Sequence, residues 1–231
     1  MLRLQKTYND AYQHLDDLVA GGVRVGVDYY ELYNNPNVAG LQGGWRSGQP
    51  IDAALLARRW ADAARTVRAA GGYPALPSLS PSGAIADTEF LARFLDELAA
   101  QGSLDALDGA WLPVQNYMGN RPLEDKDGFH KFERYHQIVL DKTGRTLPII
   151  TTEGGAVVGD SEDPRYPAIT DQLVAQRTAD AFAYMQGDAP DYYFAFMPWL
   201  LVNARRVGRR TVGNATPGSR WTSRRGPWWT P

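Results

Sequence analysis

Four groups of polar and aromatic residues follow apolar segments of the chain, where they could form a reactive site: Asn34-Asn35-Pro36-Asn37, Gln115-Asn116-Tyr117, Thr152-Glu153-Gly154-Gly155 and Pro198-Trp199. Glu153 carries a carboxylate that could act as a nucleophile. The plainer interpretation of Glu153 is a solvated turn residue or an acid at a helix N-terminus. The first group could equally be a simple turn, because Asn and Pro favour turns for their own reasons. Tyr117 and Trp199 could be core aromatics, and we place Trp45, Trp111, Tyr192, Tyr193 and Phe194 in the core.

The composition excludes several other chemistries. The 231 residues contain no Cys, which removes disulfides, thiolate zinc sites and a cysteine nucleophile. His14, His130 and His136 fall on predicted helices without a pair at metal-ligand spacing, so we expect no metal and no cofactor. Gly154-Gly155 lacks the Lys-Ser/Thr of a phosphate loop. A net charge of −2 gives no reason to expect nucleic acid or an anionic membrane as a partner.

The hydrophobic pattern alternates strands with amphipathic helices. We predict helices over 8–20, 51–70, 87–100, 128–142 and 171–186, and strands over 24–34, 73–79, 109–117, 147–152 and 191–201. Gly21-Gly22 and Gly71-Gly72 are expected to end the first two helices. Regular alternation of this kind predicts an α/β protein with a parallel sheet, because parallel strands need helical crossovers.

Two parallel architectures compete, the doubly wound sheet and the eight-stranded barrel. No strand is followed by the Gly-x-Gly-x-x-Gly of a dinucleotide site. Polar groups at the carboxyl ends of several strands are instead typical of barrel enzymes. Five predicted strands at about 35 residues per unit leave the chain about three strands short of a full barrel.

The four groups then resemble the strand ends of clan A glycoside hydrolases, retaining β-glycosidases and endoglycanases on (β/α)8 barrels. Tyr30 to Asn37 is similar to the Asn-Glu-Pro end of that family's fourth strand, which carries the acid/base. Leu147 to Gly155 is similar to the seventh strand, which would make Glu153 the nucleophile. The family's sixth strand corresponds to Gln115-Asn116-Tyr117, and its eighth ends in a sugar-stacking Trp, here Trp199. The resemblance implies an incomplete TIM barrel comprising strands four to eight with their helices, and it assigns sugar contacts to Asn34, Gln115, Asn116, Tyr117 and Trp199.

The sequence departs from that family at the acid/base position, where Asn35 stands in place of Glu. A retaining glycosidase uses two carboxyl groups about 5 to 5.5 Å apart. A neutral amide transfers no proton, and losing general acid/base catalysis typically costs ~10²–10⁴-fold. Glu31 lies four residues earlier in the predicted strand, about 13 Å deeper, and does not obviously substitute. Loop acids after the sixth strand remain open as replacements: Glu124, Asp125 and Asp127.

Residues 203–231 differ from the rest of the chain. They contain seven Arg and no acid, so this tail carries +7 and residues 1–202 carry −9. The tail could bind RNA or single strands, or be a disordered linker. A third interpretation, which we favour, is translation out of frame, since an acid-free Arg/Gly/Pro/Trp mixture is typical of a GC-rich gene in the wrong frame. We therefore expect a glycosidase-like domain over 1–202.

Two functions follow from these expectations. The first is a glycoside-hydrolase-like protein acting on or binding β-linked glycans, with Glu153 kept and the acid/base replaced by Asn35. The second is a non-catalytic carbohydrate-binding or interaction protein, or an inactive gene fragment whose partner would be the missing amino-terminal half-barrel. No apolar run approaches the roughly 18 to 20 residues of a membrane span, and the first residues lack a signal-peptide core, so we expect no membrane partner and the location is not indicated.

Overall fold

The computed structural model describes residues 1–4 and 10–199, within a compact unit that ends at Trp199. Its strands are β1 (Leu2–Leu4), β2 (Tyr29–Leu32), β3 (Tyr73–Pro74), β4 (Leu112–Tyr117), β5 (Ile149–Gly155) and β6 (Tyr193–Phe196). Its helices are α1 (Leu15–Val23), α2 (Ala53–Ala69), α3 (Asp87–Ala100), α4 (Lys131–Thr143) and α5 (Asp171–Gly187). Each helix lies between two consecutive strands, which confirms the predicted βα alternation.

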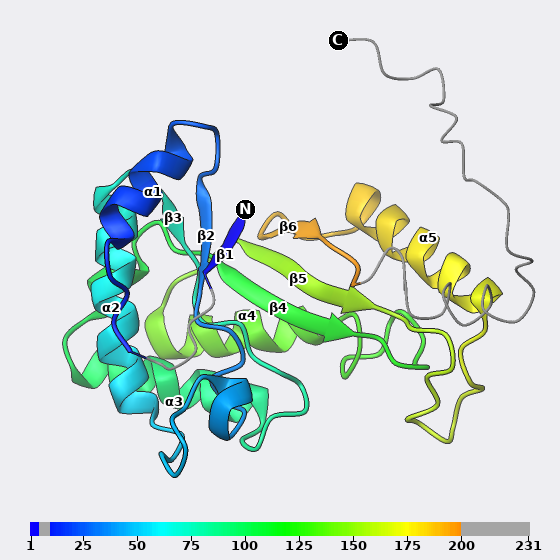
Figure 1. Cartoon of the computed structure of the whole chain (residues 1–231). Helices are drawn as coiled ribbons and strands as arrows, with labels where there is room; N and C mark the ends of the chain where they lie inside the picture. The colour runs from blue at the N-terminus through cyan, green and yellow to red at the C-terminus, as the bar shows by residue number, and fades with distance from the viewer. Residues whose placement is uncertain (5–9, 200–231) are drawn as a thin grey trace, which may run out of the picture. The chain divides into compact units, whose positions relative to one another are not determined.

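The strands are parallel and neighbour one another in chain order. They form two three-stranded sheets, β1-β2-β3 and β4-β5-β6, and an isolated parallel bridge between Ala75 and Trp111 connects β3 to β4. A second bridge, between Asn34 and Ser78, extends the pairing beyond the ends of β2 and β3. All carboxyl ends of the strands therefore meet at one edge, and the helices lie around the outside (Figure 1).

The amino-terminal part of the chain differs most from the prediction. β1 was not predicted, so the described chain has six strands where the sequence indicated five. The predicted strand 24–34 is confined to Tyr29–Leu32, because Tyr33 and Asn35 both adopt a left-handed backbone. Gly21 and Gly22 lie inside α1 and do not end it. Residues 5–9 and the predicted tail 203–231 lie outside the described residues.

Most of the core lies between the strands and the outer helices. α2 begins where the Asp52 carboxylate accepts a hydrogen bond from the Leu55 N–H at 2.9 Å. Its buried stripe packs on that of α3, and the rings of Trp60 and Phe94 meet edge to face at 5.5 Å. The inner face of the strands holds a much smaller buried cluster, formed by Ala75, Trp111 and Ile150.

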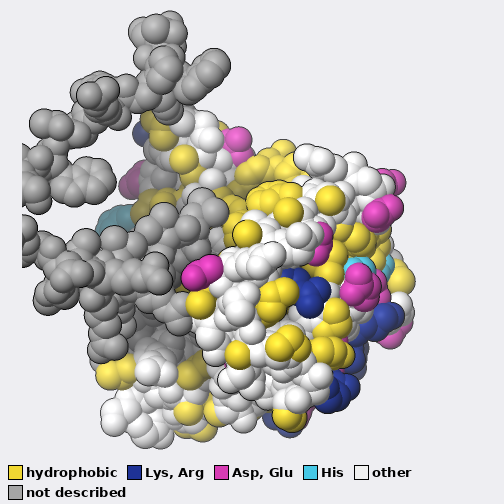
Figure 2. Space-filling view, turned by 90° about the vertical axis from the view of Figure 1, so that its right-hand side faces the viewer, with side chains coloured by type: hydrophobic (Ala, Val, Ile, Leu, Met, Phe, Trp, Pro, Cys, Tyr) yellow, Lys and Arg dark blue, Asp and Glu magenta, His cyan; other side chains and the backbone are white. Residues whose placement is uncertain are grey.

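α5 contributes little to the core. Ala181 is the buried residue of this helix, and Phe182 is exposed. Figure 2 shows the side of the molecule that carries α5, where apolar side chains reach the surface in several places between charged ones.

The aromatic residues expected in the core divide into two groups. Trp45, Trp111 and Tyr193 are buried as predicted. The prediction for Phe194 was wrong, because 63% of this residue is exposed. Successive residues of a strand point to opposite faces. Tyr193 therefore points to the helices, while Phe194 points to the sparsely filled inner face.

Candidate functional site

A cavity of about 520 Å³ lies at the carboxyl ends of the strands. Glu153 enters it from β5, Gln115 and Tyr117 from β4, and Asn35 from the turn after β2. The remaining lining comes from loops and from the first residue of α4: Ser80, Pro81, Ser82, Arg121, Asp127, Lys131 and Glu162. Four residues that the sequence assigned to a site thus share one cavity.

Glu153 is held by hydrogen bonds to both of its carboxylate oxygens. It is buried, as is every residue of β5, and the pairing of β5 with β4 places it beside Gln115. The Tyr117 hydroxyl donates to Oε2 at 2.8 Å, and the Arg3 guanidinium forms an ion pair with Oε1. Burial, and then the hydrogen bond to Glu153, raise the pKa of Tyr117, so its hydroxyl keeps the proton that it donates. The arrangement presents a fixed carboxylate to the cavity.

Arg3 connects Glu153 to a second acid beneath the cavity. Its Nε lies 2.8 Å from Oε2 of Glu31, whose side chain is fully buried. Burial raises the pKa of Glu31, although Arg3 opposes this effect. Burial also disfavours the charge of Arg3, but Glu31 and Glu153 outweigh it and raise the pKa of the guanidinium. Arg3 is thus a cation shared by two carboxyl groups.

Asn35 faces the cavity through a neutral hydrogen-bonded group. The Gln115 amide donates to the Asn35 side-chain oxygen at 2.8 Å and to the Ser78 hydroxyl at 3.2 Å. Asn35 has a left-handed backbone with φ of 54°, a conformation that Asn tolerates better than most residues. Asn35, Gln115 and Ser78 can therefore form hydrogen bonds, but none of their side chains is a carboxyl group or another readily ionised group.

Two buried asparagines fix the loops that close the cavity. Asn37 donates to the carbonyls of Ser80 and Ile85 at 2.7 and 3.0 Å, and so positions the loop after β3. Asn120 donates to the carbonyls of Asp163 and Tyr166 at 2.7 and 2.9 Å, and so positions the loop after β5. The second loop brings Glu162 to the rim of the cavity.

Three residues that the resemblance assigned to sugar contacts do not line this cavity. Asn116 is buried, and its amide donates to the Phe129 carbonyl and the Tyr193 hydroxyl at 2.8 and 3.1 Å. It therefore orders the core between β4 and the helices, and its assignment as a sugar ligand stays a prediction. Asn34 is half-buried and bridges to Ser78. Trp199 is exposed, and its backbone N–H donates to the Gly154 carbonyl at 2.8 Å; a stacking role for its side chain stays a prediction.

The sequence did not single out Arg3, Arg121, Lys131 or Glu162. Arg3 lies in a strand of three residues, which is too short for a periodic pattern. The other three belong to loops or a helix start, and only the folding of those loops brings them to the cavity. Of the loop acids considered as replacements for the acid/base, Asp127 lines the cavity, whereas Glu124 and Asp125 do not. A charged residue within an apolar strand, such as Arg3 or Glu31, is the signal that could have indicated the buried ion pairs.

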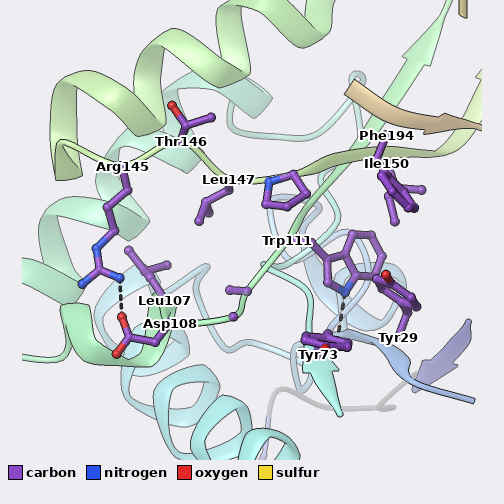
Figure 3. Close-up of a pocket in the computed structure, with 13 residues that line it drawn as sticks. Tyr29, Tyr73, Leu107, Asp108, Trp111, Arg145, Thr146, Leu147, Ile150 and Phe194 are labelled. Carbon is purple, nitrogen blue, oxygen red and sulfur yellow. Dashed lines mark hydrogen bonds and ion pairs between the residues drawn. The ribbon is translucent and has the colours of Figure 1, made fainter. Parts of the chain in front are cut away.

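A larger cavity, of about 750 Å³, lies at the opposite, amino-terminal ends of the strands. Figure 3 shows an aromatic group at one end of it, where Trp111 donates to the Tyr73 carbonyl at 3.0 Å and Tyr29 lies close by. An ion pair between Asp108 and Arg145 lies at the other end. This cavity is mostly apolar and holds none of the predicted site residues.

The described residues contain no group of three or more His, Asp or Glu placed to hold a metal ion. No helix in the described ranges is long and apolar enough to cross a membrane.

Comparison with known proteins gives matches in structure alone: no protein-family model and no curated protein sequence matches the chain. The fold is similar to that of glycoside hydrolases. A family GH128 subgroup III curdlan-specific exo-β-1,3-glucanase from Blastomyces gilchristii, in complex with glucose, matches with a TM-score of 0.55 and 14% identity over 84% of this chain and 72% of that chain. A GH128 subgroup I endo-β-1,3-glucanase from Amycolatopsis mediterranei, in complex with laminaritriose, matches with a TM-score of 0.50 and 17% identity over 87% and 71%.

A glucosidase from Croceicoccus marinus matches with a TM-score of 0.53 and 18% identity, over 80% of this chain and 36% of that chain. These likenesses concern the fold. They confirm the predicted resemblance to barrel glycoside hydrolases over most of the chain. The chain therefore has the α/β fold of alternating parallel strands and helices found in those enzymes.

Proposed function

We propose that the chain is a glycoside-hydrolase-like protein that binds or acts on β-linked glucans, with Glu153 in the nucleophile position and Asn35 in the acid/base position. The observation that carries this proposal is that both residues line one cavity at the carboxyl ends of parallel strands, together with Gln115 and Tyr117. Barrel enzymes build their sites at this edge. The solved structures of similar fold include β-1,3-glucanases, one of them bound to laminaritriose, which supports a β-1,3-glucan as the ligand.

The six strands would correspond to strands three to eight of a complete barrel, with β1 as the third. β2 precedes Asn35 and β5 carries Glu153, in the order that the family has for its fourth and seventh strands. β1 adds one strand to the five that the sequence predicted, and it contributes Arg3 to the site.

Titration calorimetry with laminaritriose tests the proposal. We expect saturable binding in the micromolar to millimolar range, weaker binding of cellotriose, and loss of most of the heat in Tyr117→Ala. Tyr73→Ala is the matched control, because Tyr73 lies at the opposite end of the strands in the larger cavity. Absence of laminaritriose binding by a folded wild-type chain would contradict the proposal.

A non-catalytic carbohydrate-binding protein is the second candidate, and the neutral pair of Asn35 and Gln115 favours it. The two candidates differ in turnover. Binding of laminaritriose with no reaction of any glycoside would support the second candidate.

A further inference from the structure

Among the described residues that line it, the cavity holds a candidate nucleophile but no carboxyl group suited to protonate a leaving group. Asn35 and Gln115 are carboxamides that hydrogen-bond to each other at 2.8 Å, and Ser78 completes the group. None of these side chains transfers a proton readily near neutral pH. The place where a retaining glycosidase holds its acid/base is therefore occupied by neutral groups.

The other carboxyl groups near the cavity do not replace that acid. Asp127 and Glu162 line the rim, with side chains 57% and 71% exposed, and they pair with Arg134 and Arg121. Glu31 is buried, but it binds Arg3 and does not line the cavity.

Glu153 is held at both of its carboxyl oxygens by the same surroundings. Arg3 binds one of its oxygens and the Tyr117 hydroxyl binds the other, so the carboxyl group has a fixed orientation. A carboxylate held in this way can attack an anomeric carbon. A retaining glycosidase uses one carboxyl group as nucleophile and a second as acid/base. Here Glu153 corresponds to the first, and Asn35 stands in the place of the second.

We infer that the chain reacts with glycosides whose aglycone leaves as a stable anion, such as aryl glycosides with electron-withdrawing rings and acyl glycosides. This inference rests on the proposed function. A Glu153 oxygen attacks the anomeric carbon, the bond from that carbon to the aglycone oxygen breaks, and the electron pair leaves with the aglycone. No proton is needed, because the departing anion is stable by itself. In alkyl glycosides and in glucans the leaving group is a strongly basic alkoxide. These compounds therefore react far more slowly.

The second step, in which water hydrolyses the glycosyl-enzyme, is expected to be slow because it too needs an acid/base residue. Water must attack the glycosyl-enzyme and release a proton, and Asn35 cannot accept that proton. A small anion such as azide needs no deprotonation, and the neutral Asn35 does not repel it. Azide then displaces Glu153 from the anomeric carbon and gives a β-glycosyl azide, with Glu153 leaving as a carboxylate.

The test compares 2,4-dinitrophenyl, 4-nitrophenyl and phenyl β-laminaribioside on the wild type and on Asn35→Glu, with Asn35→Gln as the control. Gln matches Glu in size and experiences the same backbone strain at φ of 54°, so the two variants differ only in the ionisable group. We expect a burst of dinitrophenolate equal to the enzyme concentration. Intact mass should show one laminaribiosyl group on Glu153, absent in Glu153→Gln.

Three results support the inference together. In the wild type, the rate of aglycone release in the first turnover falls at least ~10²-fold from the dinitrophenyl to the phenyl compound. Asn35→Glu raises the rate with the phenyl compound by ~10²-fold or more, and Asn35→Gln does not. Azide accelerates turnover by the wild type and by Asn35→Gln, but not by Asn35→Glu.

Three results overturn it. Equal rates of aglycone release in the first turnover for the three compounds in the wild type would show that a proton donor is present. Absence of an adduct with the dinitrophenyl compound, in a chain that binds laminaritriose by calorimetry, would show that Glu153 does not attack while the proposed binding function stands. Absence of both the adduct and laminaritriose binding would instead reject the proposed function, and this inference with it.

Discussion

Arg3 is the cation that two carboxyl groups share, and its removal should be costly. Arg3→Met would leave Glu31 buried without its partner, and breaking a buried pair typically costs ~3–5 kcal/mol. Replacing both residues, in Arg3→Met/Glu31→Met, removes the buried charge as well. We therefore expect the double variant to be more stable than the single one, as measured by urea unfolding. If the double variant were no more stable than Arg3→Met, the loss of Arg3 would not leave a destabilising buried charge on Glu31.

Glu31 should also make the stability of the chain depend on pH. Burial raises the pKa of Glu31 in the folded chain above its usual value of 4.5, so the folded chain binds this proton more tightly than the unfolded chain does. The free energy of unfolding therefore falls as pH rises from the usual value through the raised one. Glu31→Gln should remove this part of the dependence when urea unfolding is repeated from about pH 4 to about pH 7. An unchanged pH profile would contradict the expectation.

Tyr117 fixes the second oxygen of Glu153, and its hydroxyl can be removed without changing its ring. Hydrogen bonds to charged groups contribute ~1.5–3 kcal/mol. We expect Tyr117→Phe to slow the dinitrophenyl reaction by ~10-fold or more with little change in KM, because the bond aligns the attacking carboxylate. Tyr73→Phe, at the far end of the strands, should react at the wild-type rate. Equal rates in the two variants would indicate that Arg3 alone aligns Glu153.

At the scale of elements, the strand β5 depends on a glycine to place Glu153. A Cβ atom at Gly154 would lie 2.7 Å from Asn116 Oδ1 and 3.0 Å from the Phe196 ring, too close for either. Gly154→Ala should therefore displace β5 from its neighbours and destabilise the chain by ~1–3 kcal/mol. Gly187→Ala is the control, because nothing lies near its added methyl group. Equal melting temperatures for the two variants would show that β5 accommodates the methyl group.

The elements also show what the sequence could and could not predict. α3 follows its prediction at both ends, because its apolar stripe is continuous from Phe90 to Leu98. α1 does not follow its prediction, because Gly22 does not end the helix. Its lack of a side chain instead lets the helix pack closely against Tyr30, whose hydroxyl would lie 2.1 Å from a Cβ atom at this position. Glu153, Asn35, Gln115 and Tyr117 were predicted from local motifs. Arg3 was not, because its role depends on the pairing of β1 with a strand 28 residues further along the chain.

At the scale of the whole described unit, the strands form an open array with an incompletely filled inner face. Within residues 1–4 and 10–199, β1 pairs only with β2, and β6 only with β5. A closed barrel fills its interior with side chains from every strand. Here the inner cluster is small, and Phe194 remains 63% exposed beside the larger cavity. Open edges and exposed aromatic surface both favour association with other chains.

Phe194 allows this expectation to be measured. Sedimentation velocity should show association that increases with protein concentration, and Phe194→Ser should weaken it. The free energy of unfolding should change little, because most of the ring is already in water. Phe182→Ser is the matched control, since Phe182 is also an exposed phenylalanine but lies on α5 at the outer side. A wild-type chain that stays monomeric at every concentration would mean that the inner face does not bind other chains, and equal weakening by both variants would place the contact elsewhere.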